Sequence, residues 1–208
     1  MQKNSRRRRI LLVLAMLLLA TVVLSLLVGR YPSPGFMPWS RLTGDELAGR
    51  LVWNLRLPRL LTALLLGMTL SAAGMVFQVL FSNPLVEPGF LGVSQGASFG
   101  AALAIVVLGG TALQTQVSAA LFSLGGLGFS YLLARRLHYG GWVLRLVLAG
   151  IAVSAFFSAG LGMLKYMADP MRQLPEITFW RLGGLASITW EKLLTVLPVT
   201  LAGSQVLG

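Results

Sequence analysis

Long apolar runs separated by short polar or charged stretches dominate the chain. A helix needs about 20 apolar residues to cross a hydrocarbon core of about 30 Å. Six segments approach or reach this length, the last stopping short without a closing charge, at roughly residues 10–29, 60–82, 92–109, 114–134, 143–164 and 192–208. The pattern predicts an all-α fold, a polytopic membrane helical bundle that forms a single transmembrane domain over residues 1–208.

The composition agrees with a lipid-embedded protein. Apolar residues make up 56% of the 208 positions and charged residues only 11%, whereas about 25% charged residues are usual in globular proteins. This leaves too little polar surface to cover a water-soluble globule, which excludes an ordinary cytosolic enzyme. The chain has no cysteine and one histidine, so disulfides, thiol catalysis and thiolate or His-cluster metal sites are excluded. We expect no cofactor.

The distribution of charge predicts the orientation in the membrane. Lys3 and the run Arg6 to Arg9 directly precede the first apolar segment, which favours a cytoplasmic N-terminus of a multi-pass protein in the cell inner (plasma) membrane. A cleaved signal peptide is the alternative, but the apolar run exceeds the usual 7–15 residues and no A-x-A-like site follows. Alternation then places Arg135 and Arg136 inside and residues 30–59 and 165–192 outside.

Both predicted outer segments are basic, against the usual tendency. Residues 30–59 hold five arginines and two acids, and residues 165–192 hold four cations and three acids. One interpretation is a docking surface for an acidic soluble partner, and the other is snorkelling of long cations to lipid headgroups. A capping box from Thr43 to Glu46 predicts an outer amphipathic helix that Pro58 ends.

The most irregular stretch runs from Ser82 to Phe90, with two prolines, a glycine, Asn83 and Glu87 between two apolar segments. Irregular backbone at membrane depth has to be buried in protein or to face a water-filled cavity, and such segments mark transport pathways. The alternative is a plain tight turn at the inner surface. His138, in the next inner turn, is either a proton relay or a structural residue.

Small residues recur at every fourth position in two predicted spans. The third span carries Gly92, Gly96, Gly100 and Ala104, and the fifth carries Gly150, Ser154, Ser158 and Gly162. Such a ridge lets another helix come close. The contact lies either within this chain or between two chains.

The sequence has no nucleotide-binding G-x-x-x-x-G-K-[ST] loop and no Ser/His/Asp or paired-carboxylate constellation. An intramembrane enzyme is therefore disfavoured, and the energy for any transport has to come from a partner or from an ion gradient. An ion-coupled secondary transporter with broken helices is the alternative function. It would need acids within the membrane, for which Glu87 is the one candidate between Glu46 and Asp169.

Three stretches together resemble a known family. They are Leu55-Arg-Leu-Pro-Arg59, the segment Asn83 to Ala97 (NPLVEPGFLGVSQGA), and the segment Ile177 to Trp190 (ITFWRLGGLASITW). In this order and spacing they resemble the FecCD-type permeases of binding-protein-dependent ABC importers for iron chelates (siderophores and haem) and cobalamin. The middle motif is long and specific.

The resemblance implies a permease subunit without an ATPase site of its own, in a type II importer. Two permease chains, as a homodimer or heterodimer, would form a pathway for a metal chelate that opens by alternating access. Two cytoplasmic ATPase subunits would drive it, and a periplasmic or lipoprotein substrate-binding protein would deliver the cargo. Nucleic acid is not an expected partner. We expect a ferric siderophore, the commonest cargo of the family, although haem and cobalamin permeases share these motifs.

The resemblance also implies roles for individual residues. The predicted sites are binding-protein docking by Arg56 and Arg59, a cytoplasmic gate of Asn83, Leu85, His138 and Tyr139, and a pathway and dimer helix with Gly150, Ser154, Phe157, Ser158 and Gly162. The Ile177 to Trp190 motif would lie outside, near the mouth of the pathway. Family permeases have roughly ten spans, so the six predicted here correspond to the N-terminal part of the fold, and the segment that grips the ATPase is missing.

Overall fold

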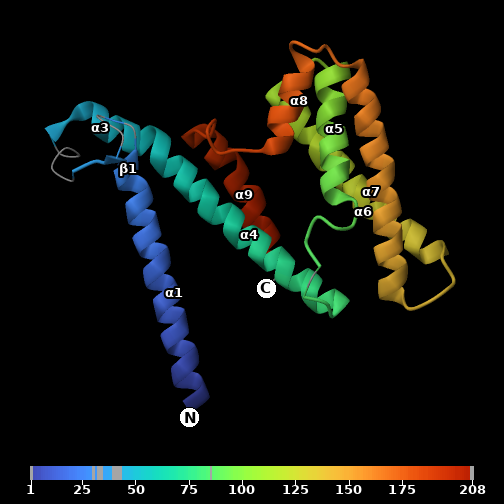
Figure 1. The fold of residues 1–208 in the computed structure, drawn as a ribbon, viewed down its shortest axis with the longest axis horizontal. Helices are drawn as coiled ribbons and strands as arrows, with labels where there is room; N and C mark the ends of the chain where they lie inside the picture. Colours follow the sequence, from blue (N-terminus) through green and yellow to red (C-terminus); the bar gives the residue numbers. More distant parts are fainter. Residues whose placement is uncertain (1, 30, 32–34, 39–43, 85, 207–208) are drawn as a thin grey trace. The chain divides into compact units, whose positions relative to one another are not determined.

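The computed structural model describes residues 2–29, 31, 35–38, 44–84 and 86–206, and these are almost entirely helical, as predicted (Figure 1). The helices are α1 (Gln2–Leu27), α3 (Glu46–Leu51), the π-helix η1 (Val52–Arg56), α4 (Leu57–Phe81), α5 (Val93–Val107), α6 (Ala112–Arg136), α7 (Trp142–Met167), α8 (Gln173–Leu182) and α9 (Trp190–Val206). Two short antiparallel strands, β1 (Val28–Gly29) and β2 (Gly35–Phe36), follow α1.

Four stretches of helix in the described chain are long and apolar enough to cross a membrane. They are Ser5–Leu27, Glu46–Phe81, Ala112–Arg136 and Trp142–Met167. The third expected span is a helix of only 15 residues, α5, which extends for about 22 Å at 1.5 Å per residue. The sixth is the 17-residue helix α9, which contains Pro198. The division into six spans stays a prediction.

The chain packs into two units, and the division falls within α4. Unit 1 comprises residues 1–69 and 185–208, and unit 2 comprises residues 70–184. Unit 2 contains the irregular loop after α4 and helices α5 to α8. Unit 1 contains α1, the two strands, α3, η1, the first half of α4 and α9.

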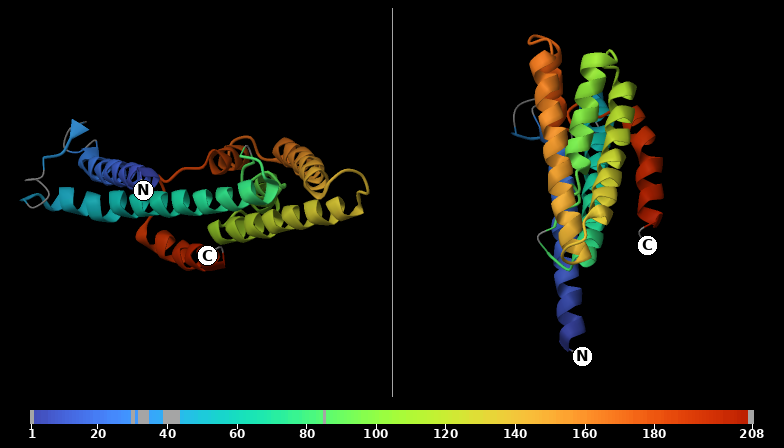
Figure 2. Two further views of the ribbon diagram at one scale, coloured as in Figure 1. Left: turned by 90° about the horizontal axis from the view of Figure 1, so that it is seen from below. Right: turned by 90° about the vertical axis from the view of Figure 1, so that its right-hand side faces the viewer.

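Helices α5, α6 and α7 lie side by side in unit 2 (Figure 2). The small residues of α5 face α6 so closely that a Cβ on Gly100 would lie 2.5 Å from the Ser118 carbonyl oxygen, and one on Gly96 would overlap the Phe122 carbonyl. The Ser118 hydroxyl donates a 2.7 Å hydrogen bond to the Gly100 carbonyl across the same contact. The ridge of the third predicted span therefore packs within the chain, and that alternative is confirmed for this ridge.

Two apolar clusters fill the ends of unit 2, and aromatic rings fill its middle. One cluster joins the loop after α4 to α6 and α7, and the other joins α5, α7 and α8. Between them the rings of Phe99, Phe122 and Phe157 lie 5.2 to 6.3 Å apart. Gln173 of α8 donates to the carbonyls of Ile105 and Val106, which are among the last of α5, and so satisfies acceptors that the helix itself leaves open.

The helix of unit 1 that the sequence predicts to start at the Thr43 to Glu46 capping box differs from that prediction at both ends. Its N-cap is Asp45, whose carboxylate accepts from the amides of Leu47 and Ala48, whereas Thr43 lies outside the described residues. The helix does not end at Pro58 but continues through η1 into α4. In the wider π turn, the Leu57 amide donates to the Val52 carbonyl, five residues back. Such a turn shifts the carbonyl that a proline ring would otherwise meet.

We expect Gly100→Ala to destabilise unit 2 by about 1–3 kcal/mol, because the added methyl group has to push α6 away. Gly125→Ala is the matched control, since it lies within α6 and a Cβ there meets nothing within 4 Å. The control should be neutral or stabilising by about 0.5–1 kcal/mol. The measurement is loss of helical circular dichroism on titration of mixed micelles with SDS. Equal effects of the two substitutions would contradict the packing argument.

Candidate docking, gate and pathway residues

Arg56 ends the π-helix and reaches the C-terminal end of α1. Its guanidinium donates a 2.6 Å hydrogen bond to the carbonyl of Leu26, one residue before α1 ends. The same group lies against Gly29 so closely that a Cβ there would overlap it. A cation at this place satisfies a free carbonyl and complements the negative end of the helix dipole.

Arg59, one helical turn further along, holds the segment before α9. Its guanidinium donates to the carbonyl of Ala186. Close by in sequence, the Trp190 indole donates a 2.9 Å hydrogen bond to the Trp53 carbonyl, and the two rings lie 5.7 Å apart. These contacts fasten residues 186–190 to the stretch of helix from η1 to the start of α4.

The structure thus brings Arg56 and Arg59 together. Both residues line a cleft of about 570 Å³ whose other walls come from α1, β1, α4 and Leu185. Each guanidinium has five N–H donors and donates one hydrogen bond to the described residues, so donors remain for a further acceptor. Their docking role stays a prediction, and Arg30 and Arg41 of the same basic segment lie outside the described residues.

The loop that follows α4 is anchored in the core of unit 2. Phe81, Val86 and Leu91 are buried in one cluster with residues from the end of α6 and the start of α7, namely Ala134, Leu146 and Ala149. Among the described residues other than glycine, Ser82 alone has a positive φ, +49°. The polar residues Asn83 and Glu87 are exposed. The apolar residues of the loop therefore pack into the core of unit 2, while its polar side chains are exposed.

The loop joins α5 at a close crossing of three helices. Gly92 has φ +80°, and a Cβ there would lie 2.8 Å from Cγ1 of Val153. The hydroxyl of Ser130, which is fully buried, donates a 2.8 Å hydrogen bond to the Leu91 carbonyl. Sequence reasoning missed Ser130 and Gly126, whose Cβ would overlap Gly92. The sequence does contain a signal for both residues, because a glycine and a serine four residues apart within an apolar run are typical of a close helix contact.

The proposed gate residues lie at one end of unit 2. Asn83 is exposed in the loop, and His138 and Tyr139 are exposed in the turn between α6 and α7. The shared cluster of Val86 and Ala134 places this loop and this turn at the same end of the unit. Leu85 lies outside the described residues. The gate role stays a prediction.

The five residues predicted for the pathway helix do not share one face of α7. Gly150 is buried against Phe90 and Leu91, and Phe157 is 2% exposed among the aromatic rings. Ser154 is half-buried at the edge, and Ser158 and Gly162 are exposed, with open space around Gly162. Gly150 and Phe157 thus pack within the unit, and Ser158 and Gly162 remain free for a pathway or a dimer contact.

Comparison with known proteins identifies relatives of this chain. The model of the FecCD transport family matches residues 17–207. The molybdate import system permease protein MolB of Haemophilus influenzae is 38% identical over 84% of this chain and 53% of its own length. The hemin transport system permease protein HmuU of Yersinia pestis is 35% identical over 79% and 51%. The vitamin B12 import system permease protein BtuC of Escherichia coli is 36% identical over 88% and 55%.

A solved structure has the same fold. It is an inward-facing conformation of an ABC transporter assigned to the metal-chelate type, 37% identical, with a TM-score of 0.83 over 96% of this chain and 61% of that chain. The all-α permease bundle predicted from the sequence is thereby confirmed. The chain spans about half the length of the curated relatives it matches. On this evidence, the chain belongs to the FecCD transport family of ABC importer permeases.

Proposed function

We propose that the chain forms the N-terminal part of a permease subunit that moves a metal-containing compound across the inner membrane. Two permease chains would enclose the pathway, which opens alternately to the two sides as a binding protein docks outside and ATPase subunits change state inside. The observation that carries this proposal is the loop from Ser82 to Gly92. This loop contains most of the family-specific motif, and its backbone is irregular. It is anchored at the crossing of α5, α6 and α7.

The ion-coupled alternative has less support. It would need an acid within the spans as an ion ligand, and Glu87 is exposed in the loop. Co-purification of ATPase subunits with the native permease, together with uptake that needs ATP and survives collapse of the ion gradient, is the test of the importer. Uptake that stops when the gradient collapses would favour the alternative.

The cargo is proposed as a metal chelate or a metal oxyanion. Relatives are named for molybdate, hemin and vitamin B12, so the shared feature is a metal-containing solute. The ferric siderophore predicted from the sequence is the first cargo to test. Competition among a ferric siderophore, haem, cobalamin and molybdate for uptake by the native transporter would identify it.

We expect loss of charge at the proposed docking site to weaken association with the binding protein. Arg56→Gln with Arg59→Gln keeps a donor for the two carbonyls and removes both charges, and should lower affinity about tenfold, as expected for two partly exposed ion pairs. The loss should be greatest at low salt, where screening is weakest. Arg135→Gln with Arg136→Gln makes the same change in charge at exposed positions on the proposed cytoplasmic side, which the binding protein would not reach. The affinity for the binding protein is measured by surface plasmon resonance on the native permease. An equal loss of affinity for both pairs of substitutions would contradict the docking role.

The proposed orientation predicts which residues react from each side. Because the chain has no cysteine, single replacements can be labelled cleanly. Tyr139→Cys should react with an impermeant maleimide only in inside-out vesicles, and Lys192→Cys only in right-side-out vesicles. The reverse pattern would invert the topology, with a periplasmic N-terminus.

The proposed pathway face of α7 can be tested by placing a large side chain on it. Ser158→Trp in the native permease should lower uptake by about tenfold or more, since a close-packed pathway has no room for an indole, while ATPase subunits still bind. Met163→Trp is the control, on the same helix about 140° around its axis. Unchanged uptake with Ser158→Trp would remove this face of α7 from the pathway.

A further inference from the structure

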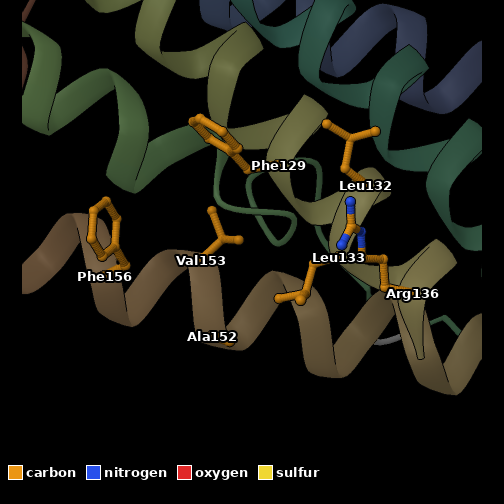
Figure 3. Close-up of a pocket in the computed structure, with 7 residues that line it drawn as sticks. All are labelled: Phe129, Leu132, Leu133, Arg136, Ala152, Val153 and Phe156. Carbon is orange, nitrogen blue, oxygen red and sulfur yellow. The ribbon is translucent and has the colours of Figure 1, made fainter.

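An apolar groove on unit 2 is not used by the proposed transport function. It lies between α6 and α7 and has a volume of about 480 Å³ (Figure 3). Its lining consists of six apolar residues and one cation, namely Phe129, Leu132, Leu133, Ala152, Val153, Phe156 and Arg136. All seven belong to unit 2, so the groove is a feature of that unit alone.

The groove is elongated and polar only at one end. The four residues contributed by α6 follow the spacing i, i+3, i+4, i+7, so they form one face of that helix. From Phe129 to Arg136 this face extends for about 10 Å along the helix axis. Phe129 and Phe156 lie toward one end and Arg136 lies at the other (Figure 3). A flexible hydrocarbon chain with a negative group at its end matches this arrangement.

The cation at the groove is free to bind an anion. Arg136 makes no hydrogen bond or ion pair with the described residues and is exposed at the last residue of α6. Arg145 nearby in the sequence donates to the Leu137 carbonyl and lies over the Trp142 ring, and Arg135 lies over the Tyr131 ring. Of these three arginines, Arg136 is the one whose guanidinium lines the groove.

The nearest acid to Arg136 by place in the fold is Glu87, which is exposed in the loop at the same end of unit 2 and forms no ion pair with Arg136. The sequence from residue 88 to residue 168 contains no Asp or Glu, and the turn between α6 and α7 adds His138. Trp142 and Tyr131, whose rings lie 5.8 Å apart, are residue types enriched at the level of lipid headgroups. The end of α6 and the start of α7 therefore combine unpaired positive charge with interfacial aromatic residues.

We propose that this groove binds an anionic phospholipid, with an acyl chain along the apolar walls and the phosphate at Arg136. A guanidinium offers two parallel N–H donors to phosphate oxygens, and basic pockets between transmembrane helices on the cytoplasmic side bind anionic headgroups. A zwitterionic lipid would bring an ammonium group toward the same cations. The proposal requires that α6 and α7 span the membrane, and it holds whatever the cargo is.

The test is native mass spectrometry of the purified full-length permease titrated with phosphatidylglycerol or with phosphatidylcholine. The first phosphatidylglycerol should bind about fivefold tighter than the first phosphatidylcholine, as one arginine at a membrane surface provides. Arg136→Gln should abolish this preference. Arg172→Gln removes an exposed cation at the N-cap of α8, beyond the other end of α7, and should leave the preference intact. Equal binding of the two lipids, or equal effects of the two arginine substitutions, would overturn the proposal.

A second pair of variants tests the groove itself. Ala152→Trp should fill the groove and weaken binding of the first phosphatidylglycerol, whereas Ile151→Trp, at the neighbouring exposed residue that does not line the groove, should not. If both variants bind lipid as the unmodified protein does, another helix covers the groove, and the proposal fails. Circular dichroism of each variant before titration establishes that the helices are retained.

Discussion

The architecture of unit 2 depends on the close approach of the α5 backbone to that of α6. Lipid tails are as apolar as leucine, so the hydrophobic effect contributes little to helix association in a bilayer, and packing and interhelical hydrogen bonds have to stabilise it. Gly96 and Gly100 allow that approach because they have no side chain at the contact. Two serines of α6 then bond across it, Ser118 to the Gly100 carbonyl and Ser130 to the Leu91 carbonyl.

These two hydrogen bonds also explain where the irregular loop lies. Ser130 and Ser118 are twelve residues apart on α6, so together they fix both the distance and the register of α5. Once Leu91 and Gly92 are held against α6, the preceding residues have to emerge at the end of the α6–α7 pair, where Val86 and Phe81 are buried. The Leu91 carbonyl accepts from the buried Ser130 hydroxyl, and burial of such a bond within protein is the condition for irregular backbone at membrane depth. The packing of α5 thus positions the segment on which the proposed gate depends.

Much of this could be predicted from the sequence, and the failures have identifiable causes. Apolar length located the helices, and the four-residue spacing of small residues located the α5 contact. In α7 the same spacing spreads the four small residues over different environments, because each step of four residues advances 40° beyond a full turn. Over three steps Gly150 and Gly162 are about 120° apart, so one faces the core and the other is exposed. In α5 all four residues of the ridge are buried, so the spacing alone does not decide how many members of a ridge enter one contact.

Unit 1 illustrates a different limit, because its contacts join residues that are far apart in sequence. Pro58 predicts a helix end, and nothing in the sequence indicates that a π turn before it lets the helix continue. The basic motif around it predicts positive charge at a surface, but not that Arg56 and Arg59 bind the carbonyls of Leu26 and Ala186, 30 and 127 residues away. Arginine suits these two positions better than lysine would. Its planar fork can hold a carbonyl with one donor and present others to a carboxylate, so the same side chains can fasten the helix ends and remain available to an acidic partner.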